Sequence, residues 1–230
     1  MTSDLQHDLL IVGGGGAGLR AVIAAAEASP DLDIAMVSKV YHMNARSQSG
    51  ETSMVAKMLT VFEEAGFDSL IKPNDVVAIK THCGEWNNTA YLRPVYARAL
   101  ADRVKSLDGR PFVCDTTTQP YNPHASRVTE LDFLATAERN GYSPAVLGCP
   151  FICADGFLGT DDYRVDLPEG YILKEAFVAS AIAAADVLID LPPENWSRCN
   201  VSNLGWRKGE KCQGRNIHRS RSSISCVRPR

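Results

Sequence analysis

A glycine-rich segment directly after a short apolar run restricts the fold of this chain more than any other feature. Residues 8–12 read DLLIV, which has the length and composition of a buried parallel strand. The next six residues, GGGGAG, satisfy the pattern GxGxxG, and residues 17–28 form an alanine-rich segment with helical spacing. A second apolar run occupies residues 34–37. A strand, a glycine loop, a helix and a second strand in this order predict a Rossmann-like βαβ unit.

The glycines of this loop have different roles. Gly13 permits the tight turn, Gly15 lets the backbone approach a pyrophosphate, and Gly18 lets the helix pack closely against the strand. In NAD-binding units an acidic residue at the end of the second strand binds the ribose hydroxyls, whereas Ser38 and Lys39 stand there in this chain. The loop therefore indicates a bound dinucleotide, and the Ser-Lys pair argues against an NAD-dependent enzyme. The alternative is a glycine-rich turn that binds nothing.

Residues 7–41, HDLLIVGGGGAGLRAVIAAAEASPDLDIAMVSKVY, resemble the N-terminus of succinate dehydrogenase and fumarate reductase flavoprotein subunits. That family has a Ser/Thr-Lys pair at the end of the second strand. The resemblance implies FAD contacts through Gly13, Gly15, Gly16, Gly18, Ser38 and Lys39. It also implies a covalent flavin histidine, which this chain lacks, because His42 is not the equivalent residue. The capping domain with the substrate residues is missing too, so we do not expect this chain alone to oxidise succinate or reduce fumarate.

Strand and helix patterns alternate through the rest of the chain as far as residue 191. We expect helices at residues 50–67, 92–107, 128–140 and 174–185, and strands at 76–80, 111–114, 151–154, 163–165 and 187–191. This order predicts an α/β fold with a mostly parallel sheet and helices on both faces. We therefore expect three parts: a partial FAD-binding unit at 1–41, an α/β domain at 42–191, and a basic, disordered tail at 192–230.

The second part resembles a different family, the uncharacterised domain of unknown function 362. The segments DVVAIKTHCGEWNNTAYLRP and GRPFVCDTTT carry this resemblance most specifically, within a match over residues 38–191. Many members of that family are described as iron–sulfur-cluster-binding proteins. Since both families can show a Ser-Lys-Val-Tyr sequence, we interpret residues 38–41 as a join between two ancestries.

Polar side chains crowd the carboxyl ends of three expected strands, where open α/β sheets bind their ligands. The candidate ligand or metal residues are Lys80, His82, Glu85, Arg93, Asp115 and Asp155. Cationic groups, an imidazole and carboxylates together suit a small anionic ligand or a hard metal ion. In the alternative interpretation Lys80 and Glu85 form a surface ion pair, His82 is a solvated loop residue, and Thr116–Thr118 cap the next helix.

The seven cysteines have neither ferredoxin nor structural-zinc spacing, so we do not expect an iron–sulfur cluster within this chain. Without an export signal they predict reduced thiols and a cytoplasmic protein, and no apolar run is long enough for a membrane segment. Residues 196–230 hold nine Lys or Arg and one acid, with few aliphatic residues. This abrupt change of composition indicates a divergent or out-of-frame C-terminus. No recognisable nucleic-acid-binding module accompanies the charge, so we expect no nucleic-acid partner.

These patterns predict a redox-associated α/β protein with a partial FAD-binding N-terminus and a small-anion or metal site in its main domain. We expect FAD at low occupancy and a redox partner protein. If the chain is an enzyme, it is an oxidoreductase of the flavoprotein type. The alternative is a non-catalytic binding or chimeric orphan protein that has no complete active site.

Overall fold

The structure, a computed structural model, describes residues 8–12, 25, 29, 31, 33–37, 41, 43–118, 125–166, 174–191 and 225–227. The chain divides into two compact units, residues 1–44 and residues 45–230.

The first unit contains two parallel strands. Strand β1 (Leu9–Val12) pairs with β2 (Ile34–Val37), and the register runs from Leu9 opposite Ile34 to Val12 opposite Val37. The glycine loop, Ser38, Lys39 and all of the predicted helix except Ala25 lie outside the described residues.

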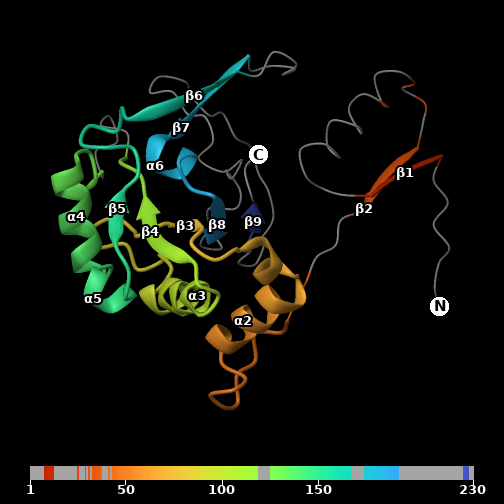
Figure 1. Cartoon of the computed structure of the whole chain (residues 1–230), viewed down its shortest axis with the longest axis horizontal. Coiled ribbons are helices and arrows are strands. Elements are labelled where there is room, and N and C mark those ends of the chain that lie inside the picture. Colours follow the sequence, from red (N-terminus) through yellow and green to blue (C-terminus); the bar gives the residue numbers. More distant parts are fainter. Residues whose placement is uncertain are drawn as a thin grey trace. The chain divides into compact units, whose positions relative to one another are not determined.

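The second unit is built on a five-stranded sheet with the order β5–β4–β3–β8–β9 (Figure 1). The strands are β3 (Val76–Thr81), β4 (Arg110–Asp115), β5 (Phe151–Cys153), β8 (Val187–Leu191) and β9 (Ser225–Val227). The first four run parallel to one another, and β9 pairs antiparallel with β8. Strand order reverses at β3, because β4 and β5 lie on one side of it and β8 lies on the other. The predicted α/β class with a mostly parallel sheet is confirmed.

The two faces of this sheet bury different residues. Val77 and Ile79 of β3 point to the larger core, which is formed with helices α2 (Met54–Glu64), α3 (Pro94–Ser106), α4 (Glu130–Arg139) and α5 (Pro144–Leu147). Ala78 and Cys114 point to a smaller core with β7 (Glu175–Ala179) and α6 (Ser180–Ala183). Alternation along β3 thus places apolar side chains on both faces, as expected for a covered parallel strand.

Capping residues determine where the main helices begin. The Ser53 side chain accepts a hydrogen bond from the backbone N–H of Ala56, so α2 starts at Met54 rather than at residue 50, where we expected it. Helix α4 begins with a capping box between Thr129 and Asp132. Since the Thr129 cap serves α4, the interpretation of Thr116–Thr118 as the cap of that helix is wrong.

The prediction of a helix over residues 174–185 is wrong for its first half. Glu175–Ala179 forms β7, which pairs antiparallel with β6 (Asp162–Asp166), and only the four residues of α6 are helical. Phe177 and Val178 favour a strand when a partner is available, and this pairing overrides the helical preference of the alanines around them.

The predicted disordered tail lies almost entirely outside the described residues, and its described part, Ser225–Val227, forms β9. A short 3-10 helix, η1 (Phe67–Leu70), links α2 to the segment before β3. None of the described helices has the length and apolar composition needed to cross a membrane.

Candidate functional site

Four of the six candidate residues in the main domain meet at one edge of the sheet. Lys80 lies near the end of β3, His82 and Glu85 follow that strand, and Asp115 is the last residue of β4. Asp155 lies two residues beyond β5, at the same edge, but binds different partners. Arg93 lies apart from these five, in a hollow described below.

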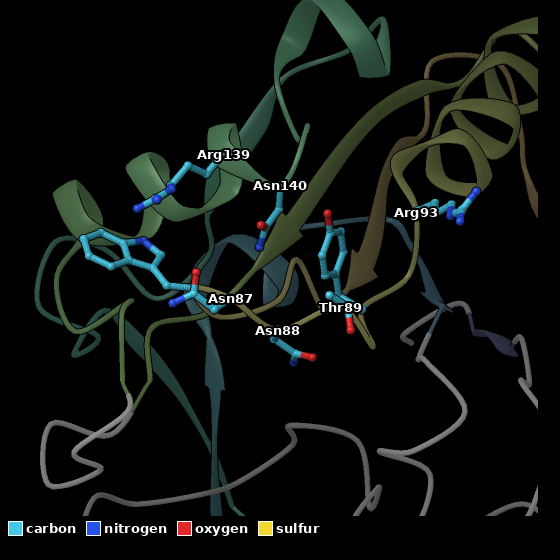
Figure 2. Close-up of a pocket in the computed structure, with 8 residues that line it drawn as sticks. Asn87, Asn88, Thr89, Arg93, Arg139 and Asn140 are labelled. Atoms are coloured by element: carbon cyan, nitrogen blue, oxygen red, sulfur yellow. The ribbon is translucent and has the colours of Figure 1, made fainter.

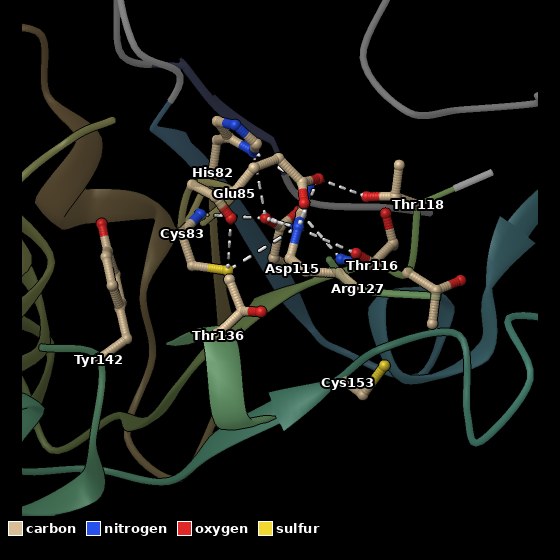
Figure 3. A network of polar contacts seen from close by, with 12 residues as sticks. His82, Cys83, Glu85, Asp115, Thr116, Thr118, Arg127, Thr136, Tyr142 and Cys153 are labelled. Carbon is tan, nitrogen blue, oxygen red and sulfur yellow. Dashed lines mark hydrogen bonds and ion pairs between the residues drawn. The ribbon is translucent and has the colours of Figure 1, made fainter. Parts of the chain in front are cut away.

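Asp115 is the centre of the buried network, by which we mean Asp115, Arg127, Glu85, His82 and Cys83 (Figure 3). Its carboxylate accepts hydrogen bonds from the backbone N–H of Cys83 at 3.0 Å and of Thr116 at 2.9 Å. The same carboxylate pairs with the Arg127 guanidinium at 2.5 Å, and Lys80 Nζ lies 3.8 Å away. With 2% of its surface exposed, Asp115 is a buried charge that is fully surrounded by donors.

Arg127 joins the two carboxylates of the network, and the sequence analysis missed it. Its Nε donates to Glu85 at 3.0 Å, and its terminal nitrogens contact Asp115, the carbonyl of Thr116 and His82 Nδ1. Figure 3 shows the guanidinium lying between the side chains of Asp115 and Glu85. Arg127 lies in a loop with no strand or helix pattern, so no periodicity could have singled it out.

Glu85 is bound by three further donors besides Arg127. The backbone N–H and hydroxyl of Ser126 donate to it at 2.8 and 2.6 Å, and the Thr118 hydroxyl donates at 2.7 Å. Lys80 pairs with Asp115 and Glu85 pairs with Arg127, so the two residues do not form the surface ion pair considered above. His82 is 5% exposed and is therefore not a solvated loop histidine.

The pKa values of the two carboxylates and of the Cys83 thiol shift in opposite directions. Burial acts to raise the pKa of Asp115, but Arg127 and Lys80 outweigh it and hold that pKa well below its usual range. Burial also opposes ionisation of Glu85, yet the hydrogen bonds from Ser126 and Thr118 and the charge of Arg127 lower its pKa. Burial raises the pKa of the Cys83 thiol, and the Asp115 charge raises it further. The two carboxylates are therefore ionised and the thiol is neutral.

Asp155 is bound by Thr117 rather than by the network. The backbone N–H of Thr117 donates to both carboxylate oxygens at 2.9 and 3.1 Å, and its hydroxyl donates to one at 2.7 Å. The loop after β5 passes so close that a Cβ on Gly159 would lie 2.0 Å from the Thr117 hydroxyl. This packing joins the ends of β4 and β5.

A hollow of about 380 Å³ opens beside the loop that follows β3 (Figure 2). It is lined by Trp86, Asn87, Asn88, Thr89, Tyr91, Arg93, Arg139 and Asn140. Arg93, at the start of α3, and Arg139, at the end of α4, lie at opposite ends of it in Figure 2. The lining contains two cations and no acid.

The remaining metal-binding and reactive side chains of the main domain were also compared with the predictions. Among the described residues, no group of three His, Cys, Asp or Glu side chains could hold a metal ion. Cys83, Cys114, Cys149 and Cys153 are free and buried. Lys80 stands opposite Asp190 of β8 in the sheet, and burial raises the pKa of Asp190.

Comparison with known proteins gives two family matches, each covering just over half of the chain. The profile of the FAD binding domain family matches residues 8–126, and the profile of the family described as domain of unknown function (DUF362) matches residues 77–193. The chain belongs to both families. The two resemblances seen in the sequence are thereby confirmed, and the FAD binding domain match continues past residue 41 to overlap the DUF362 match over residues 77–126.

The similar curated proteins are flavoprotein subunits. The chain is 55% identical over 51 residues to the fumarate reductase flavoprotein subunit of Mycobacterium tuberculosis (strain H37Rv), covering 22% of this chain and 9% of that protein. It is 44% identical over 86 residues to the fumarate reductase flavoprotein subunit of Escherichia coli K12, covering 34% of this chain and 14% of that protein. The chain thus spans about a tenth of the length of these relatives. No solved structure matches it. These matches identify a flavoprotein-like protein that carries a DUF362 domain.

Proposed function

We propose that the first unit of this chain binds the dinucleotide part of FAD. The observation that supports this is the register of β1 and β2, in which Val12 lies opposite Val37. Strands β1 and β2 therefore end at the same edge, and Gly13 and Ser38 are the residues that follow them in the sequence. Ligands of parallel α/β units bind at that edge. Gly13, Gly15, Gly16 and Gly18 would receive the pyrophosphate, and Ser38 and Lys39 would bind the adjoining ribose or phosphate oxygens.

The bound flavin would supply electron and hydride transfer, while the chain supplies binding and orientation. The relatives named above are fumarate reductase flavoprotein subunits, and this chain matches about a tenth of each. We therefore propose a redox-associated role in which a partner protein completes the flavin environment. Fumarate reduction by this chain alone is not part of the proposal.

The finer proposal is a small-anion site in the main domain, centred on Arg93 and Arg139. Within the described residues, no carboxylate pairs with either guanidinium. The hollow that they line contains no acid, and it lies next to β3, where the strand order reverses. Reversal points of open α/β sheets are common ligand sites, and two uncompensated cations favour an anion over a metal ion.

The other candidate residues fit a supporting role at this site. Glu85 binds Ser126, whose hydroxyl oxygen accepts the backbone N–H of Trp86 at 2.9 Å, so the buried network fixes the loop that forms the hollow. Asp115 holds the same loop through the N–H of Cys83. Lys80, His82 and Asp155 contribute to the packing of the same sheet edge. We propose that Glu85 and Asp115 position the site, that Lys80, His82 and Asp155 support the sheet edge, and that Arg93 contacts the ligand.

The FAD proposal is tested by reconstituting the purified chain with FAD and recording the flavin band near about 450 nm after gel filtration. We expect substoichiometric flavin in the wild-type chain and a loss of at least about tenfold in affinity for Gly15→Val, because a side chain there blocks the pyrophosphate. Gly50→Ala is the control, since nothing lies within 4 Å of its Cβ position. A wild-type chain that retains no flavin would contradict the proposal and favour a binding protein without a complete active site.

The anion proposal is tested by calorimetric titration with inorganic pyrophosphate. We expect Arg93→Gln and Arg139→Gln each to weaken binding, whereas Arg164→Gln is neutral because that exposed residue pairs with Asp166 and Glu175 on β6 and β7. Equal pyrophosphate affinities for the wild type and all three variants would contradict the proposed anion site.

A further inference from the structure

We infer that the hollow beside β3 takes a nucleoside monophosphate, a planar ring joined to a phosphate. This inference rests on the proposed anion site and names the class of ligand that it binds.

The ring is expected to stack on Trp86. Trp86 is 50% exposed, so its indole ring is accessible to a ligand. The Arg139 guanidinium carbon lies 4.8 Å from the centre of the indole ring, so one face of the ring is occupied by a cation. An indole held in this way, with surface still exposed, is a platform for a second planar group.

Amide side chains offer hydrogen bonds to the edge of such a ring. Asn87, Asn88 and Asn140 line the hollow, and each amide carries both donors and an acceptor. Asn140 already donates to the carbonyl of Cys83 at 2.9 Å, and Asn88 already accepts the N–H of Ala90 at 2.8 Å. Groups with mixed donors and acceptors suit a heterocyclic base, whose edge has the same mixture.

The phosphate is expected to bind at one of the two guanidinium groups of the hollow, that of Arg93 or that of Arg139. Figure 2 shows Arg93 and Arg139 at opposite ends of the hollow, with the amides between them. The hollow lacks any acid that would repel an anion, and a volume of about 380 Å³ falls in the range of small-molecule sites. A neutral sugar would use the indole and the amides but would leave both cations unused.

The walls of the hollow are held by buried contacts, so the site is formed before a ligand enters. Gly84 has a φ of +88°, and a Cβ there would lie 2.8 Å from the Asn140 amide and 2.9 Å from the Tyr91 ring. The Tyr142 hydroxyl donates to the carbonyl of Leu92 at 2.6 Å, which fixes the segment before Arg93. A preformed pocket loses less free energy on binding than one that must order.

The test is calorimetric titration of the full chain with four probes: AMP, adenosine, ribose 5-phosphate and inorganic phosphate. We expect AMP to bind at least about tenfold more tightly than ribose 5-phosphate or adenosine, because ring and phosphate are both recognised. Trp86→Ala should weaken AMP at least about tenfold and leave inorganic phosphate unchanged. Arg139→Gln should weaken both, and Arg164→Gln should weaken neither.

A fluorescence titration tests whether AMP binds in this hollow. In the Trp196→Phe/Trp206→Phe double variant, Trp86 is the one remaining tryptophan, and AMP should quench its emission. AMP binding that is lost in Gly15→Val and kept in Trp86→Ala would place the nucleotide at the glycine loop and overturn the inference. If phosphate binding depends on Arg93 and Arg139 while adenosine adds nothing to it, the anion site stands and the nucleotide inference fails.

Discussion

The buried network and the hollow lie next to each other in the main domain, yet their charges are used differently. In the buried network, Asp115 and Glu85 each meet several donors, and Arg127 is 5% exposed between them. In the hollow, Arg93 and Arg139 are exposed, and no described carboxylate pairs with them. Both regions contain the polar residues that mark a ligand site in sequence. Burial and pairing separate a charge that supports the fold from a charge that remains available to a ligand.

The largest effect should come from removing the cation at the centre of the buried network. Arg127→Met leaves Asp115 and Glu85 buried without their guanidinium partner, so we expect the free energy of unfolding to fall by about 3–5 kcal/mol. Urea denaturation at neutral pH measures this loss of unfolding free energy. Arg164→Met is the control, because its ion pairs on the surface contribute less than about 1 kcal/mol. Similar losses for the two variants would mean that the network does not stabilise the domain.

A smaller effect, with a defined pH dependence, is expected at Glu85. Glu85→Gln should cost about 2 kcal/mol of unfolding free energy at pH 7, because four donors face the charged carboxylate. The pKa of Glu85 is lowered in the folded state, so its stabilisation is complete above its unfolded pKa of about 4.3 and is lost as the pH falls through the lower, folded value. The difference between wild type and variant should therefore shrink only below about pH 4.

Urea denaturation at a series of pH values from neutral to acidic gives this profile. Glu138→Gln, at an exposed position on α4, is the matched control and should show no difference from wild type at any pH. A Glu85→Gln difference that stays constant below pH 4 would show that the ionised carboxylate is not the source of the stability.

The smallest change in unfolding free energy is expected from alanine at Gly159, which lies against the Thr117 hydroxyl that binds Asp155. Gly159 and Gly66 both have positive φ angles, +66° and +74°, so alanine at either position costs about 1 kcal/mol from backbone strain. Only at Gly159 would the new Cβ also meet the Thr117 hydroxyl, which is bound to Asp155. We expect Gly159→Ala to lose about 1 kcal/mol more than Gly66→Ala in thermal or urea unfolding. Equal losses would mean that the Thr117 side chain moves aside freely.

The sequence could predict the features that depend on local pattern. Apolar runs identified the strands β3, β4 and β8, and parallel strands place their carboxyl ends together, so Lys80 and Asp115 could be expected at one edge. The alanine-rich segment around Phe177 and Val178 led to a wrong prediction of a helix, because it forms a strand only by pairing with β6. No pattern marks Arg127 or Arg139 as partners of their sites, since each acts through contacts between distant segments.

The overlap of the two family matches bears on the proposed join at residues 38–41. The FAD binding domain match includes residues 77–126, where β3 and β4 form a continuous parallel sheet with β5 and β8 of the DUF362 match. Structurally, these residues belong to the second unit. The join therefore remains a prediction.

The most direct test of the division between supporting and ligand-binding charges is pyrophosphate affinity, measured beside unfolding free energy in Thr117→Val and Arg139→Gln. Thr117→Val removes a hydroxyl bound to Asp155, and Arg139→Gln removes a cation from the hollow. We expect Thr117→Val to lower the unfolding free energy by about 1–2 kcal/mol with affinity unchanged within about twofold. Arg139→Gln should lose affinity by about tenfold with less than about 1 kcal/mol of stability. Loss of affinity in Thr117→Val, or unchanged affinity in Arg139→Gln, would contradict this division.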